Sequence, residues 1–319
     1  MQKIKILLRG EKQMTKISRR TFLNISATSL ALSLIPNTLK ASQEKISWQG
    51  VALGAPSSMT LFHENSIYGE KIVSSCITEI KRLENIFSIY DKTSSISKLN
   101  KNGLLKNPPK ELVEVLSFAN KISKQSNGFF DVSIQPLWNI HKKYHNNKRV
   151  LNDKIKNTKE LVNYKNILIS KKEISFRKKN MSISLNAIAQ GYITDKISEL
   201  LRNKGFTNVL VDLGEIRAIG AHPDNRDWNI QTPYLKESYI SINNQSMASS
   251  GGYGTMFNKE LHHLFNPKSG TSENSIKAVS VVAKEAMLAD ALSTAIAVMP
   301  KKDRIKLLKF YPNVKVYIL

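Results

Sequence analysis

An internal disulfide is excluded, because the 319-residue chain has one cysteine. That residue, Cys76, lies at an apolar position of a helical pattern, where a buried and unreactive thiol is expected. The chain also has no repeat of roughly 20 to 50 residues and no low-complexity linker, which argues against a solenoid or a string of domains. Its hydrophobic content of 41% is nevertheless ample for a packed core.

Acidic residues are scarce: 25 of them stand against 48 lysines and arginines, which gives a formal charge of +23. The first 41 residues hold eight of the basic residues and one glutamate, so the remainder carries 40 basic and 24 acidic residues, or +16. Such an excess suits an anionic partner, membrane surface or ligand. The lysines are scattered over runs such as 142–156 and 171–179 without interleaved aromatic residues, unlike the focused surface that nucleic acid requires. We therefore expect no nucleic-acid partner.

The first 41 residues (1–41) have the pattern of a signal peptide. A basic start is followed by SRRTFL at 18–23 and by an apolar stretch to about Ile35, ahead of Pro36 and Ala41. Paired arginines at this place are typical of twin-arginine export, and an ordinary signal with a chance arginine pair is the alternative. The apolar stretch is shorter than the about twenty residues that span a bilayer. We expect an exported protein, periplasmic or on the outer face of the cytoplasmic membrane, where an uncleaved signal would hold it at the membrane.

Residues 45–319 are predicted to form one domain of mixed secondary structure. Alternation and helical spacing predict strands at 46–51, 58–62, 208–212, 228–231, 239–243 and 278–283, and helices from 72 to 87 and at 111–124, 187–203, 286–298 and 301–309. The lysine- and asparagine-rich run 141–158 has little apolar content and is predicted to be an exposed loop or insertion. Because strands and helices mix without strict alternation, the fold class is expected to be α+β with a largely antiparallel sheet and flanking helices.

The helix at 286–298 is apolar nearly all round but carries one carboxylate, Asp290. A buried carboxylate needs a partner, and Thr294 projects from the same helical face four residues later. Two hard oxygen ligands on one face suit Mg²⁺, which adds waters and substrate phosphates. The alternative is that Asp290 caps the first turn and Thr294 bonds a backbone carbonyl.

Two further segments have residues suited to chemistry. Residues 184–192 pass from a strand-like run at 181–185 into a helix, and small residues at a helix N-terminus favour an anionic ligand, although they also serve packing. His262 and His263 precede an Asn-Pro turn; adjacent histidines on a strand point apart, so they are poor joint metal ligands. One of them could be a general base, and a plain strand ending in a turn is the alternative.

Seven segments in this order resemble the ApbE family, the FAD:protein FMN transferases, from about Leu53 to Val298. They are FSIY at 87–90 with SKLN at 97–100, GFFD at 128–131 with Pro136-Leu137, NAIAQGYITD at 186–195, LVDLG at 210–214, SSG at 249–251, HLFNPKSG at 263–270 and ADALSTA at 289–295. The resemblance implies a single ApbE-like, T-fold-related domain.

The resemblance also implies a site and a reaction. Mg²⁺ would be held by the carbonyl of Ala187 and the side chains of Asp290 and Thr294, and His263 could take a proton from the attacking hydroxyl. The positions that contact FAD in the family are matched by Leu53, Tyr90, Phe129, Phe130, Asp131, Ser184, Gln190 and Phe265. A threonine or serine hydroxyl of another protein would attack the FMN phosphorus of FAD and release AMP. The acceptor would be a flavin-bearing subunit of a membrane redox complex.

The chain departs from the family pattern at several flavin-side positions. Family members usually have aspartate at the position of Ser184, often lysine at that of Gln190, and glycine at that of Glu215. Two alternatives follow: an FAD pyrophosphatase, in which water replaces the protein hydroxyl, and a non-catalytic flavin-binding accessory protein.

Overall fold

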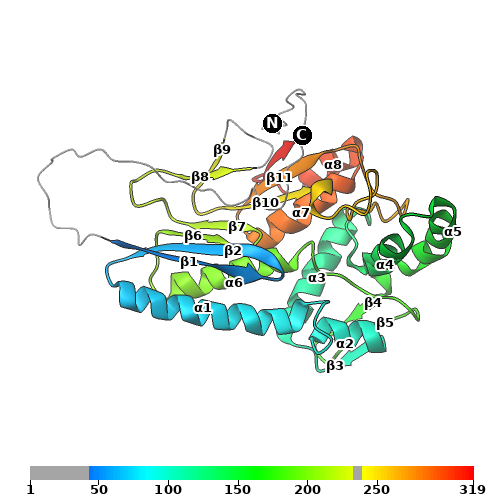
Figure 1. The fold of residues 1–319 in the computed structure, drawn as a ribbon, viewed down its shortest axis with the longest axis horizontal. Coiled ribbons are helices and arrows are strands. Elements are labelled where there is room, and N and C mark those ends of the chain that lie inside the picture. Colours follow the sequence, from blue (N-terminus) through cyan, green and yellow to red (C-terminus); the bar gives the residue numbers. More distant parts are fainter. Residues whose placement is uncertain (1–42, 233–238) are drawn as a thin grey trace, which may run out of the picture.

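The computed structural model describes residues 43–232 and 239–319, so the predicted signal peptide at 1–41 lies outside the described residues. A seven-stranded sheet forms the centre of the molecule (Figure 1). In spatial order its strands are β1 (Glu44–Ala52), β2 (Ala55–His63), β6 (Val209–Asp212), β7 (Ile216–Ile219), β10 (Ser246–Gly251), β11 (Ala278–Ala283) and β12 (Lys315–Ile318). Every neighbouring pair is antiparallel, which confirms the expected α+β class with a largely antiparallel sheet.

Three helices cover one face of this sheet in the order of its strands (Figure 1). Helix α1 (Ser66–Phe87) packs on β1 and β2, α6 (Ala189–Asn203) on β6 and β7, and α7 (Ala286–Val298) on β10 and β11. The opposite face is covered by the hairpin of β8 (Trp228–Gln231) and β9 (Tyr239–Ile242), which packs on Ala218, Met247 and Val282. Strand β11 is therefore buried on both faces, and all six of its residues are buried.

Most of the remaining elements lie at one end of the molecule, and α8 (Lys301–Leu308) lies near α7 (Figure 1). The others are α2 (Ser95–Asn102), β3 (Leu104–Lys106), α3 (Lys110–Gln125), α4 (Gln135–Tyr144), α5 (Lys148–Thr158), β4 (Ile167–Ile169), β5 (Glu173–Phe176) and four 3₁₀ helices, η1 (Val132–Ile134), η2 (Lys159–Leu161), η3 (Tyr164–Asn166) and η4 (Gly252–Gly254). Strands β3, β5 and β4 make a small sheet of their own. In the described ranges, none of the helices combines the length and apolarity that a membrane span requires.

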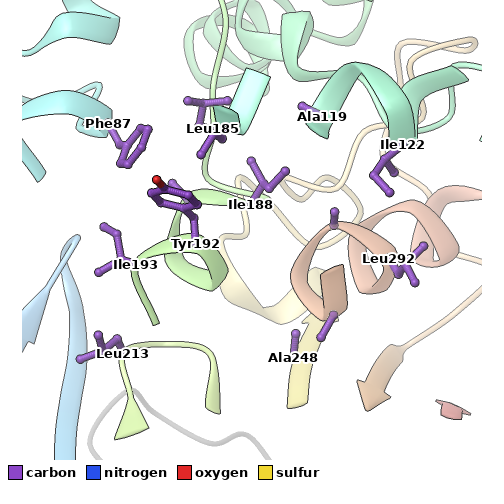
Figure 2. Close-up of a cluster of buried hydrophobic side chains, with 14 of the residues drawn as sticks. Phe87, Ala119, Ile122, Leu185, Ile188, Tyr192, Ile193, Leu213, Ala248 and Leu292 are labelled. Atoms are coloured by element: carbon purple, nitrogen blue, oxygen red, sulfur yellow. The ribbon is translucent and has the colours of Figure 1, made fainter. Parts of the chain in front are cut away.

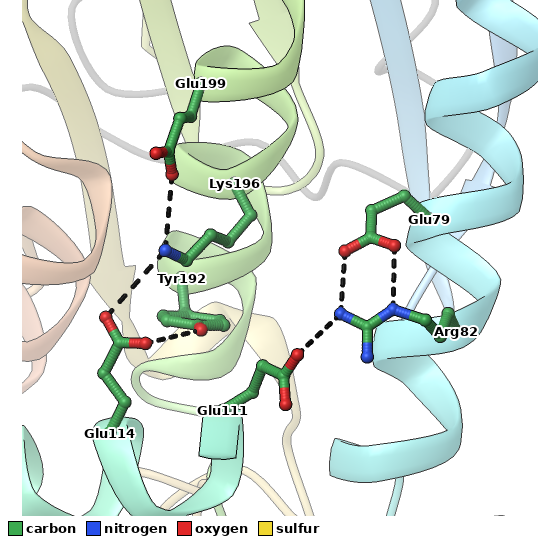
Figure 3. A network of polar contacts seen from close by, with 7 residues as sticks. All are labelled: Glu79, Arg82, Glu111, Glu114, Tyr192, Lys196 and Glu199. Carbon is green, nitrogen blue, oxygen red and sulfur yellow. Dashed lines mark hydrogen bonds and ion pairs between the residues drawn. The ribbon is translucent and has the colours of Figure 1, made fainter. Parts of the chain in front are cut away.

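The core between α1, α3, α6 and α7 is continuous, and Figure 2 shows Phe87 beside Tyr192 within it. The Phe87 and Tyr192 rings meet edge to face at 5.5 Å. The buried Tyr192 hydroxyl donates to Glu114 of α3 at 2.8 Å (Figure 3). Burial, together with this carboxylate, raises the pKa of Tyr192 far above its ordinary value. Arg82 of α1 similarly bonds Glu111 of α3 at 2.8 Å, so polar contacts join the three helices at the edge of the core.

Several predicted boundaries are confirmed closely, including those of β8, β11 and α7. The end of α6 is also confirmed: Gly205 has a φ of +89°, its N–H donates to Arg202, and that of Phe206 donates to Leu201. This pair of bonds is the Schellman arrangement, which favours glycine. Cys76 is fully buried as expected, and burial raises the pKa of its thiol to about 12.

The prediction of a loop at 141–158 is wrong, because most of this run lies in α4 and α5. The few apolar residues of α5 are spaced for one helical face: Leu151 and Ile155 are four apart and both are buried. Asn147 caps the helix by accepting a hydrogen bond from the Val150 N–H at 3.1 Å.

The strand-like run at 181–185 is extended but belongs to no sheet. Its backbone is satisfied instead by the Asn100 side chain, which accepts from the Ile183 N–H at 2.7 Å and donates to the Ile183 carbonyl at 2.8 Å. The Ser184 N–H donates to the carbonyl of Val132. Because a side chain bonds the backbone as a neighbouring strand would, the run can be buried without a sheet, and its strand-like sequence does not lead to a strand.

Candidate functional site

Helices α6 and α7 approach each other closely at Gly191. A Cβ at this position would lie 2.5 Å from the Ala286 carbonyl oxygen, so only glycine fits. One turn further along α6, Asp195 accepts hydrogen bonds from the N–H groups of Ala286 and Met287 at 2.8 and 2.9 Å. The N-terminus of α7 is therefore capped by a carboxylate from a neighbouring helix. Arg217 Nη1 lies 3.1 Å from the same carboxylate.

Asp290 lies one turn inside α7 and is 3% exposed. Its Oδ2 accepts a hydrogen bond from the Gly191 N–H at 3.1 Å. Burial raises the pKa of Asp290 to about 7, and the charge of Asp195 acts in the same direction. The alternative that Asp290 caps its own helix is therefore wrong, because Asp195 does so.

The same hydrogen bond leaves the carbonyl of Ala187 available. In a regular helix the Gly191 N–H would donate to the carbonyl four residues earlier, which is that of Ala187. It donates to Asp290 instead, and no backbone N–H of the described residues reaches the Ala187 carbonyl. The Ala187 carbonyl, just before the start of α6, is therefore free and lies beside Asp290 of α7.

Thr294 contributes a hydroxyl to the same face of α7. Its Oγ1 lies 3.1 Å from Ser250 Oγ of β10, which also lies 2.7 Å from Ser293 Oγ. The alternative for Thr294, a bond to a backbone carbonyl, does not occur among the hydrogen bonds of the described residues. In the described ranges, no three histidine, cysteine or carboxylate side chains gather as they would around a zinc ion. Carboxylate, hydroxyl and carbonyl oxygens are the donor set that suits Mg²⁺.

A cavity of about 110 Å³ opens next to this group. Its lining consists of Leu53, Phe87, Ser88, Ile89, Tyr90, Asn186, Ala189 and Gln190. Three of the predicted flavin-contacting residues, Leu53, Tyr90 and Gln190, thus come together from separate parts of the chain. Tyr90 is 70% exposed and stands at the open side. The cavity and the Asp290 group share the turn at 186–190.

Leu53 reaches the cavity because it lies in the two-residue turn between β1 and β2. Leu53 and Gly54 both have positive φ, +48° and +78°. Such a backbone matches the twist of a β-hairpin. The Leu53 N–H donates to the Glu84 carboxylate of α1, which holds the turn against the helix.

Phe129, Phe130, Asp131 and Ser184 form a second group. Asp131 caps η1 through bonds from the Ser133 N–H and hydroxyl at 2.8 and 2.6 Å, and it also accepts from the Tyr164 N–H at 2.9 Å. Burial nevertheless raises its pKa. Both phenylalanine side chains are buried, so the structure gives these residues a packing role beside any flavin contact.

Phe265 and His263 lie on the segment that follows β10. Phe265 is buried with its ring 4.3 Å from that of His141. His263 Nδ1 accepts from the Thr255 N–H at 3.2 Å, which puts the proton of the neutral ring on Nε2. Burial and the neighbouring His262 lower the pKa of His263 to about 4, so its ring is neutral near pH 7. The segment has isolated bridges in place of a regular strand.

His262 is the structural member of the histidine pair. Its Nδ1 accepts from the Leu264 N–H at 3.2 Å, and its Nε2 pairs with Asn274 Oδ1 at 3.0 Å. Both ring nitrogens are thus occupied in a buried position.

Sequence reasoning missed three charged residues around the site: Asp195, Arg217 and Glu215. Asp195 and Arg217 position α7, and Glu215 is buried in the loop between β6 and β7. In the sequence, these charged residues stand among apolar residues and glycines. The same pattern is found in ordinary surface turns, so the sequence alone does not show that these residues are buried.

Comparison with known proteins decides the family. The sequence profile of the ApbE family matches residues 53–318. The chain belongs to the ApbE family. It is 26% identical to the FAD:protein FMN transferase of Haemophilus influenzae, over 92% of this chain and 91% of that protein, and 29% identical to that of Buchnera aphidicola subsp. Schizaphis graminum, over 74% and 75%. The crystal structure of the ApbE protein of Thermotoga maritima matches with a TM-score of 0.74 and 25% identity, covering 86% of this chain and 94% of that one.

Proposed function

We propose that this ApbE-family chain is an FAD:protein FMN transferase. The observation that carries the proposal is the shared turn at 186–190, which places a cavity bounded by Leu53, Tyr90 and Gln190 beside the buried oxygen group of Asp290 and Thr294. A dinucleotide with its flavin at the cavity would have its pyrophosphate near those oxygens. The names of the family relatives support the same reaction.

In the proposed reaction, a serine or threonine hydroxyl oxygen of an acceptor protein forms a bond to the FMN phosphorus of FAD. The P–O bond of the pyrophosphate breaks, AMP leaves with the electron pair, and the hydroxyl proton passes to a base or to water. His263 is the candidate base. In the arrangement described, Nε2 carries the proton and the lone pair of Nδ1 accepts the Thr255 N–H, so Nε2 can take the hydroxyl proton only in the tautomer with its proton on Nδ1.

The oxygen group fits a magnesium ion. The carbonyl of Ala187 and the side chains of Asp290 and Thr294 would hold it. When bound, the ion would neutralise charge on the pyrophosphate. Asp195 and Gly191 support the group by fixing α7 against α6.

The predicted flavin-contacting residues divide between two places. Leu53, Tyr90 and Gln190 line the cavity, whereas Phe129, Phe130, Asp131, Ser184 and Phe265 lie in and behind the neighbouring loops. Lys268 lies over the Phe129 ring at 4.0 Å, so the two loops meet. We assign the second set to the wall that supports FAD.

The proposals for the acceptor protein and for the cellular compartment rest on other observations. The twin-arginine-like segment at 1–41 supports a periplasmic protein, or one on the outer face of the cytoplasmic membrane. The family resemblance supports a flavin-bearing subunit of a membrane redox complex as the acceptor.

The test is incubation of the purified chain with FAD, MgCl₂ and serine- or threonine-bearing peptides from such subunits, followed by mass spectrometry. We expect the mass of FMN on the peptide and free AMP, and at least a hundredfold loss in Asp290→Ala, in line with the cost of losing a preorganised charge-stabilising group. Asp224→Ala, which removes a carboxylate whose side chain is 67% exposed, should react normally.

The same assay separates the alternatives. Release of FMN and AMP with no peptide modified would support the FAD pyrophosphatase. Tight FAD binding without turnover across all peptides would support the accessory protein. Full activity in Asp290→Ala would refute the assignment of the oxygen group.

A further inference from the structure

Glu215 is a buried acidic residue next to the oxygen group. It follows Gly214, whose φ of +97° turns the chain between β6 and β7. The residue is 7% exposed. Its carboxylate accepts the Ser249 N–H, while its Oε2 is buried without a hydrogen-bond partner in the part of the chain that the structure describes. A buried oxygen left unsatisfied is rare and calls for a partner.

The surroundings of Glu215 carry negative charge. The carboxylates of Asp290 on α7 and Asp212 at the end of β6 both act electrostatically on Glu215, and with burial they raise its pKa. Among the described residues, no cation acts electrostatically on Glu215. Arg217, two residues further on, directs its Nη1 to Asp195, Ser246 and the Lys284 carbonyl, and its Nε has no hydrogen-bond partner in the described ranges. In the described part of the chain, Glu215 and Asp290 are therefore buried carboxylates that repel each other, and no basic group offsets the charge on Glu215.

Ser249 connects Glu215 to the rest of the group. It donates its N–H to Glu215, and the next residue, Ser250, places its hydroxyl 3.1 Å from Thr294 Oγ1. Glu215 is thus linked to α7 through β10, and its backbone carbonyl also accepts the Thr194 hydroxyl of α6 at 3.3 Å. A divalent cation at Asp290 would be able to satisfy the orphan oxygen as well.

We propose that Glu215 is a further ligand of the divalent cation held at Asp290, through its unpartnered Oε2. This inference rests on the proposed cation site. Two carboxylates with a hydroxyl and a carbonyl form an all-oxygen set for Mg²⁺, and a second carboxylate strengthens binding through its charge.

The test is calorimetric titration of the purified chain with MgCl₂ alone, without FAD. The variant is Glu215→Gln, which keeps the shape of the side chain and removes its charge. The matched control is Glu111→Gln: Glu111 is also 7% exposed, but it is held by Arg82 on the far side of the helix layer. We expect Mg²⁺ affinity to fall at least tenfold in Glu215→Gln and to stay unchanged in Glu111→Gln.

Thermal unfolding provides the second readout. Without metal, Glu215→Gln should melt at or above the wild-type temperature, because the repulsion with Asp290 is removed. Its upward shift on adding MgCl₂ should be smaller than that of the wild type. If the variant does not fold, Glu215→Ala is measured in the same two assays.

The outcomes separate this inference from the proposed function. Equal Mg²⁺ affinity in the wild type and Glu215→Gln, with Asp290→Ala impaired, would overturn the role of Glu215 and leave the cation site intact. No Mg²⁺ binding by the wild type would overturn both. Loss of affinity in Glu111→Gln equal to that in Glu215→Gln would show a general effect of removing buried charge and would also overturn the inference.

Discussion

Replacing Asp195 by alanine tests whether α7 is positioned by the neighbouring helix. The change removes two hydrogen bonds to the first N–H groups of α7 and the counter-ion of Arg217. Loss of a helix cap costs about 1 kcal/mol. A buried arginine that loses its carboxylate costs more, but Arg217 keeps bonds to Ser246 and to the Lys284 carbonyl, so we assign about 2 kcal/mol to this part.

The expected loss is therefore about 3 kcal/mol in the free energy of unfolding. With about 2.1 cal/mol/K of unfolding entropy per residue, a chain of this size loses roughly 1.5 °C per kcal/mol, so the melting temperature should fall by about 4 to 5 °C. Urea unfolding followed by circular dichroism gives the free energy, and calorimetry gives the melting temperature. Asp195→Asn retains one acceptor oxygen and should lose about half as much.

The control is again Asp224→Ala, a surface change expected to stay within about 0.5 kcal/mol. A melting temperature for Asp195→Ala within about 1 °C of the wild type, which corresponds to less than about 1 kcal/mol on the same scale, would refute the reasoning. It would mean that packing alone holds α7 in place.

Two further predictions concern the packing around the site. Gly191→Ala should destabilise the fold by roughly 1 to 3 kcal/mol, because the new Cβ would lie 2.5 Å from the Ala286 carbonyl oxygen. It should also weaken Mg²⁺ binding by moving α7. Urea unfolding and titration calorimetry measure the two effects, and a variant unchanged in both would contradict the close approach of the helices. His141 is fully buried, and burial lowers its pKa below the ordinary histidine value of 6.5. As the pH falls through that value, the unfolded chain therefore binds more protons than the folded chain. The contribution of His141 to the free energy of unfolding decreases as the pH falls. The stability advantage of the wild type over His141→Phe should therefore shrink between pH 7.5 and pH 5.5 in urea titrations; a constant difference would show that His141 titrates normally in the fold.

The elements that the sequence predicts well are those whose pattern is complete in itself. Helix α7 is apolar nearly all round and lies between Glu285 and Met299-Pro300, and β11 has five apolar residues and one serine, so both boundaries could be predicted. Strand β10, with the sequence SMASSG, was missed because small residues carry no periodic signal and its strand state comes from the pairing with β11. Helix α5 was not predicted because only two of its residues are buried, which leaves too few apolar positions for a helical pattern.

The candidate site shows the same division. Asp290 and Thr294 could be found because they share one helix face, so their proximity follows from local geometry. The contact between Asp195 and the start of α7 joins residues 91 positions apart, and no local pattern encodes it. Glu215 follows a glycine in a tight turn, where a glutamate is normally solvated. Contacts with β10 and α6, which come from distant parts of the chain, make it a buried acid.

The turn at 186–190 belongs both to the cavity and to the oxygen group, and this sharing has a thermodynamic consequence. Asn186, Ala189 and Gln190 line the cavity. The carbonyl of Ala187, in the same turn, is left free because the Gly191 N–H donates to Asp290. Whatever occupies one place therefore acts on the conformation of the other. By reciprocity of binding free energies, any factor by which the cation tightens the nucleotide must equal the factor by which the nucleotide tightens the cation.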